Sequence, residues 1–310
     1  MGCESIKVFF LTGLPKTGTT WCANFLSHFL EREVFLLMIR EEEIMSFKVL
    51  QCGYPRSGNY FLWRLISLCQ KKNGIYSSFL IKSGLSKMFE YLFDFKKIEP
   101  LFKEFFEVDE VIIEGKKSVV AKLPIEIDQE LLLHSSSLIW THSSPREIVD
   151  FALRIPLRFY LIRDGRDVVN SFIHHSCREN VRKLCGYQIK EPIQVYERFD
   201  IFEKYVRGWA EHVKSFLEWK QIFIEIRFEK LVNFGPHFQL ILKLFSLEKE
   251  EKFFKSTLTF EKLKKENPEH IRKGQVGNWR EFFTERHKEI FKEIAGDLLI
   301  RLSYEKDFNW

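Results

Sequence analysis

The chain has 310 residues, 45% of them hydrophobic, which suffices for the core of one large α/β domain or two small ones. Its formal net charge of +5 suits an anionic ligand, but the chain has neither the Lys/Arg blocks nor the RNA-binding motifs of a nucleic-acid-binding protein. Six cysteines without a Cys-x-x-Cys pair, and no signal peptide or apolar run of about 18 residues, predict a cytoplasmic protein without a membrane span.

The first strand-loop-helix pattern lies near the start of the chain. Val8 to Leu11 form a short apolar strand, a glycine-containing loop follows, and a helical pattern runs to about Leu30. This arrangement presents backbone N–H groups and the positive end of the helix dipole to a phosphate. Gly13 and Gly18 have the spacing of a Walker P-loop, but Thr19 stands where that motif has Lys. A nucleoside-triphosphate kinase is therefore disfavoured.

The same plan repeats 40 residues later, where Pro55 aligns with Pro15. A strand over Phe47 to Gln51 leads into a loop from Gly53 to Tyr60, and a helix then extends to about Cys69. The pattern does not return again, so the chain is not a repeat array. We interpret residues 1–44 as an N-terminal extension with an extra phosphate-binding loop, or as a partial duplication, before a complete domain over residues 45–310.

The central part of the chain holds little recognisable chemistry. Residues 71–135 are rich in Phe and Lys and predict mostly amphipathic helix, with a short strand at Val119 to Lys122. Leu138 to Pro145 predict a strand that ends in a turn carrying His142. A lone histidine is more often structural than catalytic, so this pattern alone leaves its role open.

A second phosphate-binding pattern follows the next apolar strand. Phe159 to Ile162 predict a strand buried on both faces of a parallel sheet, and a basic turn and a helical pattern come after it. Open α/β sheets bind ligands at the carboxyl ends of such strands. Arg163 and Ser171, eight residues apart, are close enough to hold one phosphate. A solvated strand end with an Arg-Asp cluster is the alternative.

The last third adds a core helix over Tyr196 to Trp219, a strand over Ile222 to Arg227 and a helix around Leu240 to Leu247. Arg272 and Lys273 are followed by two glycines three residues apart, which predict a flexible basic loop that folds over a phosphate; a surface charge cluster is the alternative. The order of these elements predicts one α/β domain with a central parallel sheet flanked by helices and a P-loop-like loop.

Two of these loops resemble the phosphosulfate-binding loop of the sulfotransferases that use 3′-phosphoadenosine-5′-phosphosulfate (PAPS). Lys16 to Trp21 match that family's Lys-Ser/Thr-Gly-Thr-Thr-Trp almost letter for letter. Arg56 to Phe61 match a looser form of it. The resemblance covers most of the chain from residue 46 onward, with a further partial match at residues 6 to 30.

Three further motifs carry the same resemblance. Arg163 and Ser171 have the spacing of the family's 3′-phosphate pair. Arg272 to Trp279 match its Arg-Lys-Gly-x-x-Gly-Asp-Trp, with Asn278 in place of Asp. His142 lies 21 residues before Arg163, where the family has its catalytic base.

The resemblance implies a PAPS-dependent sulfotransferase that moves the sulfuryl group to a hydroxyl or amine of a small-molecule acceptor, with PAP as product and no metal. His142 would be the general base, and Arg56 the loop cation that takes part in catalysis. The implied cofactor-binding residues are Arg56, Ser57, Gly58, Asn59, Tyr60, Arg163, Ser171, Arg272, Lys273 and Gly274. The alternative loop would instead use Lys16, Thr17, Gly18, Thr19, Thr20 and Trp21.

Departures from the family pattern leave some points open. Trp140 stands where the family often has a Lys near the sulfuryl group, so a catalytically inactive PAP-binding protein of the same fold is the alternative function. The family's C-terminal dimer motif is not clearly present, and the oligomeric state stays open.

One site has room for one phosphosulfate loop. Residue identity favours Lys16, but the shorter interval to Arg163 favours Arg56, and we expect Arg56 to serve.

Overall fold

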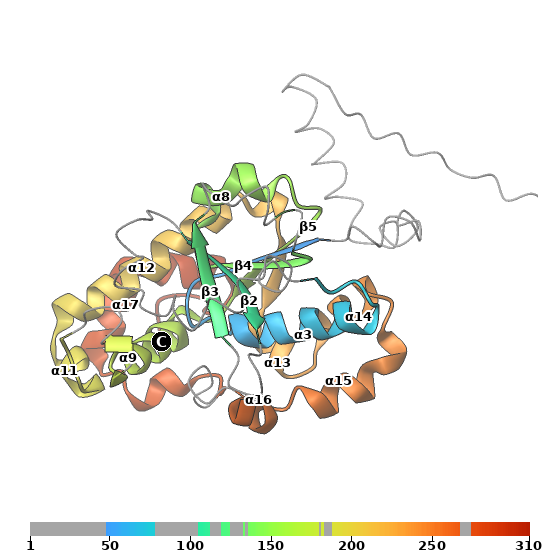
Figure 1. The fold of residues 1–310 in the computed structure, drawn as a ribbon. Coiled ribbons are helices and arrows are strands. Elements are labelled where there is room, and N and C mark those ends of the chain that lie inside the picture. Colours follow the sequence, from blue (N-terminus) through green and yellow to red (C-terminus); the bar gives the residue numbers. More distant parts are fainter. Residues whose placement is uncertain are drawn as a thin grey trace, which may run out of the picture. The chain divides into compact units, whose positions relative to one another are not determined.

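The computed structural model describes residues 48–77, 105–111, 119–124, 133, 136–179, 181–182, 188–266 and 274–310. A mixed β-sheet lies at the centre of this described part. Its strands are β1 Val49–Cys52, β2 Phe105–Val111, β3 Val119–Pro124, β4 Leu138–Thr141, β5 Leu157–Ile162 and β6 Ile224–Arg227. In this described part they form the order β3-β2-β4-β1-β5-β6 (Figure 1). Neighbours within β4-β1-β5-β6 pair in parallel, whereas β2 and β3 are antiparallel.

The predicted α/β fold with a central parallel sheet is confirmed, but one segment differs from its prediction. The sequence predicts mostly helix over residues 71–135, and β2 is a strand within that range. Its partners lie far along the chain, because Phe105 pairs with Pro124 and Glu107 with Trp140. Strand preference depends on such neighbours more than on local sequence, which is why the prediction was wrong for β2.

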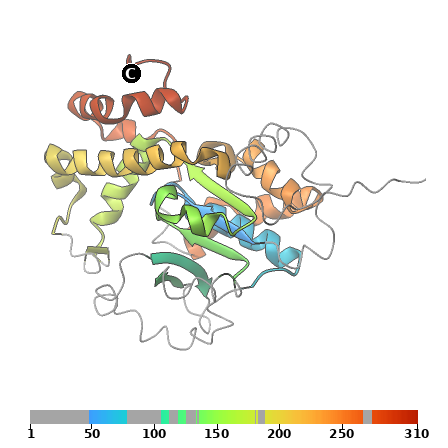
Figure 2. The ribbon, with the colours of Figure 1, turned by 90° about the horizontal axis from the view of Figure 1, so that it is seen from above.

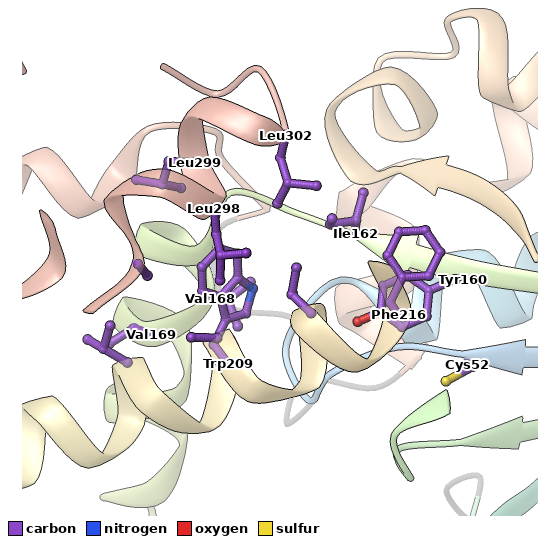
Figure 3. Close-up of a cluster of buried hydrophobic side chains, with 14 of the residues drawn as sticks. Cys52, Tyr160, Ile162, Val168, Val169, Trp209, Phe216, Leu298, Leu299 and Leu302 are labelled. Carbon is purple, nitrogen blue, oxygen red and sulfur yellow. The ribbon is translucent and has the colours of Figure 1, made fainter. Parts of the chain in front are cut away.

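One face of the sheet packs against a layer of helices and forms the main hydrophobic core. The helices are α8 Pro145–Ala152, α9 Gly165–Ser176, α12 Phe199–Glu218 and α17 Glu285–Arg301. Figure 2 shows α12 between the sheet and α17. Tyr160 of β5 stacks on Phe216 of α12 with ring centroids 3.9 Å apart, and Cys52 and Ile162 belong to the same cluster (Figure 3).

Helix α12 forms because its apolar residues recur every three or four positions, which places them on one face. Phe202, Val206, Trp209, Val213 and Phe216 are all buried. The sequence predicts this helix from Tyr196, but a separate helix, α11 (Pro192–Glu197), precedes it and α12 begins at Phe199.

Helix α3 (Asn59–Lys72) packs against β1 and β4 on the opposite face. Side chains alternate along a strand, so Gln51 points away from the core face of Cys52 and donates from Nε2 to the Asn59 backbone oxygen at 2.7 Å. The remaining elements are η4 Lys220–Ile222, α13 Phe228–Val232, α14 Pro236–Leu244, η5 Glu248–Glu250, α15 Glu251–Thr257, α16 Phe260–Glu266 and η6 Asn278–Glu281.

The carboxyl ends of the four parallel strands carry the predicted site. His142 follows β4, Gly53 follows β1, Arg163 follows β5 and Phe228 follows β6. Because these strands are neighbours, segments up to 175 residues apart in the chain meet at one edge of the sheet. Among the described residues, no helix is long and apolar enough to cross a membrane.

Candidate functional site

The loop between β1 and α3 has a backbone conformation that requires its glycine. Gly58 has φ 104°, and a Cβ built there would lie 2.2 Å from the Phe228 ring. Arg56, with φ 72°, also adopts a positive φ. Asn59 closes the loop, since its Nδ2 donates to the Tyr54 oxygen at 2.9 Å. Helix α3 begins directly after Gly58, so the positive end of its dipole lies at this loop, as at the anion sites of other helix N-termini.

His142 lies against this loop, and its contact defines its tautomer. Its Nδ1 is 2.7 Å from the Gly53 carbonyl oxygen. A carbonyl only accepts, so Nδ1 carries a hydrogen, and in the neutral ring Nε2 then carries the lone pair. The ring also packs edge-on against Trp140, with centroids 5.4 Å apart. The contact with the Gly53 carbonyl thus fixes the orientation of the His142 ring at the edge of the sheet.

His212 supports His142 from the core, and it is absent from the sequence-based candidates. Its Nε2 lies 3.1 Å from the His142 carbonyl oxygen and must donate to it, so its Nδ1 accepts from the Tyr160 hydroxyl at 2.7 Å. Burial lowers the pKa of His212 to about 4, which keeps the ring neutral. A histidine on the apolar face of a helix, between Trp209 and Phe216, was the signal that could have found it.

Arg163 and Ser171 meet Arg56 at the other side of the loop. Arg163 donates from Nη1 to the Arg56 carbonyl at 3.3 Å and from Nη2 to the Gln275 carbonyl at 2.9 Å. Its guanidinium lies over the Phe228 ring, 4.2 Å from the centroid. Arg56 donates from Nε to Ser171 Oγ at 3.3 Å. The structure therefore brings together the loop cation and both members of the predicted 3′-phosphate pair.

Asp167 ties the C-terminal loop to this cluster. Its buried carboxylate accepts from the Gly277 N–H at 2.6 Å and from the Trp279 N–H at 3.0 Å, and lies 3.8 Å from Arg163 Nη2. Burial raises the pKa of Asp167, against the lowering effect of Arg163 and of these two N–H donors. Gly274 has φ 65°, and a Cβ there would lie 2.3 Å from the Phe260 ring.

Asn278, which replaces the Asp of the family motif, lies in a buried amide network beside Asp167. Asn170 Nδ2 lies 3.5 Å from its Oδ1, and the Tyr196 hydroxyl donates to Asn170 Oδ1 at 2.5 Å. A neutral amide at this position fits a network of neutral groups without the cost of burying another charge.

The other predicted residues divide into two groups. Ser57 is buried in the loop, and Asn59 and Tyr60 lie in the first turn of α3, with the Tyr60 ring stacked on Trp63 at 6.0 Å between centroids. The predictions for Arg272 and Lys273, and for the alternative loop Lys16, Thr17, Gly18, Thr19, Thr20 and Trp21, lie outside the described residues. Within the described part, no group of His, Cys, Asp and Glu side chains is arranged to hold a metal ion.

Comparison with known proteins decides the family. The model of the sulfotransferase domain matches residues 7–303. This chain belongs to the sulfotransferase family. The match includes both phosphosulfate-type loops, so it does not choose between them. A search of curated proteins found no match.

Solved sulfotransferases share the fold at low sequence identity. Mouse sulfotransferase SULT7A1, complexed with PAP, is 15% identical, and the alignment covers 84% of this chain and 90% of that one with a TM-score of 0.50. Retinol dehydratase, in complex with androsterone and inactive cofactor PAP, is 18% identical over 82% of this chain and 81% of that one, with a TM-score of 0.51. These similarities establish the fold.

Proposed function

We propose that this sulfotransferase moves the sulfuryl group of PAPS to a hydroxyl or amine of a small-molecule acceptor. One observation carries the proposal: a single loop contacts both the expected base and the expected 3′-phosphate pair. Gly53 accepts from His142 Nδ1, and three residues later Arg56 contacts Arg163 and Ser171. A donor with phosphate groups at the 3′ and 5′ positions of its ribose would meet an acceptor beside His142 at this loop.

The described residues fit a bound 3′-phosphate. Arg163 Nε is buried and has no hydrogen-bond partner within the described part of the chain, although a guanidinium normally uses all its donors. Gly58 and Gly274 both have positive φ, a backbone conformation that can turn successive N–H groups toward an anion. Arg163, Ser171 and the Gly274 loop would hold the 3′-phosphate, and so select PAPS over ordinary nucleotides.

PAPS supplies the sulfuryl group, whose transfer is an in-line displacement with a loose transition state like that of phosphoryl transfer. Catalysis then depends mainly on position and charge, so Arg56 and the N–H groups at the start of α3 would stabilise negative charge on the transferring oxygens. His142 Nε2 would take the proton of the acceptor hydroxyl as its oxygen attacks. The Gly53 carbonyl would stabilise the resulting imidazolium, because it already accepts from Nδ1.

A catalytically inactive PAP-binding protein is the second candidate. Trp140, where the family often has Lys, is buried and packs against His142, so one cation near the sulfuryl group is replaced by an indole. Both candidates bind PAP, and only the first transfers sulfate. The buried free thiols of Cys52, Cys69 and Cys177 fit the cytoplasmic location that we propose for either.

Incubation with labelled PAPS and a panel of alcohols, phenols and amines tests the choice. We expect one acceptor class to take up label, and His142→Ala to lower the turnover number about 100-fold or more while PAP affinity stays nearly unchanged. His237→Ala, at a half-buried histidine on α14, is the matched control and should retain turnover. PAP binding with no transfer to any acceptor would favour the second candidate, and unchanged turnover in His142→Ala would return His142 to a structural role.

A further inference from the structure

Arg166, in the first turn of α9, is buried, although it is an arginine with no part in the proposed chemistry. Its side chain is 2% exposed. Its guanidinium lies between two indole rings, 4.3 Å from the Trp279 centroid and 4.4 Å from the Trp310 centroid. Two carboxylates pair with it, Asp164 at 2.7 Å and Glu305. A buried arginine is tolerated only with such complete pairing, so these four partners are held firmly around it.

The partners come from three separate segments. Asp164 belongs to the turn between β5 and α9, Trp279 belongs to η6, and Glu305 and Trp310 belong to the C-terminal segment Tyr304–Trp310. The C-terminal segment is also linked to the turn through Glu229 of α13. The Tyr304 hydroxyl donates to Glu229 Oε2 at 3.2 Å, and Glu229 Oε1 accepts from the Asp164 N–H at 3.1 Å.

The stacked ring of Trp279 links this cluster to the 3′-phosphate pair. The backbone N–H of Trp279 is held by Asp167, and the same loop supplies the Gln275 carbonyl that orients Arg163. The two indoles also touch each other, with centroids 5.9 Å apart. Loss of the Trp310 ring would leave one face of Arg166 and one edge of Trp279 without a partner, which frees the end of the loop that positions Arg163.

We infer that the C-terminal segment Tyr304–Trp310 is a positioning element of the 3′-phosphate site, and that Trp310 acts through Arg166 and Trp279. This inference rests on the proposed function, since it concerns how that site recognises the 3′-phosphate. It assigns no catalytic role to the segment. It predicts that the ring of Trp310 contributes to affinity for nucleotides that carry a 3′-phosphate and not to affinity for those that lack it.

Trp310→Leu tests the inference by calorimetric titration with PAP and with adenosine 5′-phosphate. We expect the dissociation constant of PAP to rise about tenfold, within the range of measured coupling between linked sites, and that of adenosine 5′-phosphate to stay unchanged. Trp310→Phe keeps an aromatic face for Arg166 and should recover most of the PAP affinity. It also controls for folding, since it makes the smaller change in volume.

Trp219→Leu is the matched control. Trp219 is, like Trp310, a partly buried indole on the same core, but it lies at the end of α12 that precedes β6, beside the amino ends of the strands. The Trp219→Leu substitution should lower the melting temperature of the protein without changing its affinity for PAP. Unchanged PAP affinity in Trp310→Leu, or equal losses for both nucleotides, would overturn the inference while leaving the function standing. Absence of PAP binding in the wild-type chain would overturn both.

Discussion

Replacement of His212 by Gln should remove a defined part of the acid sensitivity of the fold. Burial lowers the pKa of His212 to about 4 from its ordinary 6.5. As the pH falls below 6.5 the unfolded chain takes up a proton, and the folded chain resists it until about 4. The stabilisation is therefore complete above 6.5 and is lost as the pH falls through this window. Between about pH 7 and about pH 5 the loss is about 2 kcal/mol.

The measurement is a difference of differences. Urea unfolding of wild type and His212→Gln at about pH 7 and about pH 5 yields the free energy of unfolding of each, and every other titrating group cancels. The variant should be less stable at neutral pH, because the Tyr160 hydroxyl and the His142 carbonyl lose a partner, yet its loss on acidification should be smaller by about 2 kcal/mol. His237→Gln, at a less buried histidine whose pKa is also lowered by burial, should show a smaller change. Equal acid sensitivity of His212→Gln and wild type would refute the assignment of a neutral, buried His212.

Two further predictions concern the cofactor site. Arg163→Ala should weaken PAP binding by roughly 1.5–3 kcal/mol and hardly affect adenosine 5′-phosphate, because a charged hydrogen-bonded pair to the 3′-phosphate is lost; calorimetry measures both, and equal losses would contradict the role. Arg56→Ala in the full chain should abolish PAP binding whereas Lys16→Ala should not, and a chain that begins at Met45 should fold and bind PAP. The reverse mutational result would make Lys16 and its neighbours the working loop.

The features of this protein that depend on neighbouring residues could be predicted from the amino-acid sequence. Three such features each lie within a short stretch of sequence. They are the apolar run that forms β5, the glycines of the Arg56 loop, and the eight-residue interval from Arg163 to Ser171. Alternating strands and helices also predicted the parallel sheet, and with it the edge where these residues meet. Backbone conformation and side-chain spacing are short-range properties, so they leave a trace in consecutive residues.

Which distant residues complete the site depends on how the elements pack, and that could not be predicted from the sequence. β2 is a strand because of its partners in β3 and β4, and no pattern within it predicts them. From the sequence, His212 is predicted only as a core residue of a helix. In the structure its Nε2 lies 3.1 Å from the carbonyl oxygen of His142, which follows β4. Arg166 and Trp310 are 144 positions apart, and they meet because α9 and α17 both pack against α12. Packing joins residues without regard to their separation along the chain, and such contacts have no local signature in the sequence.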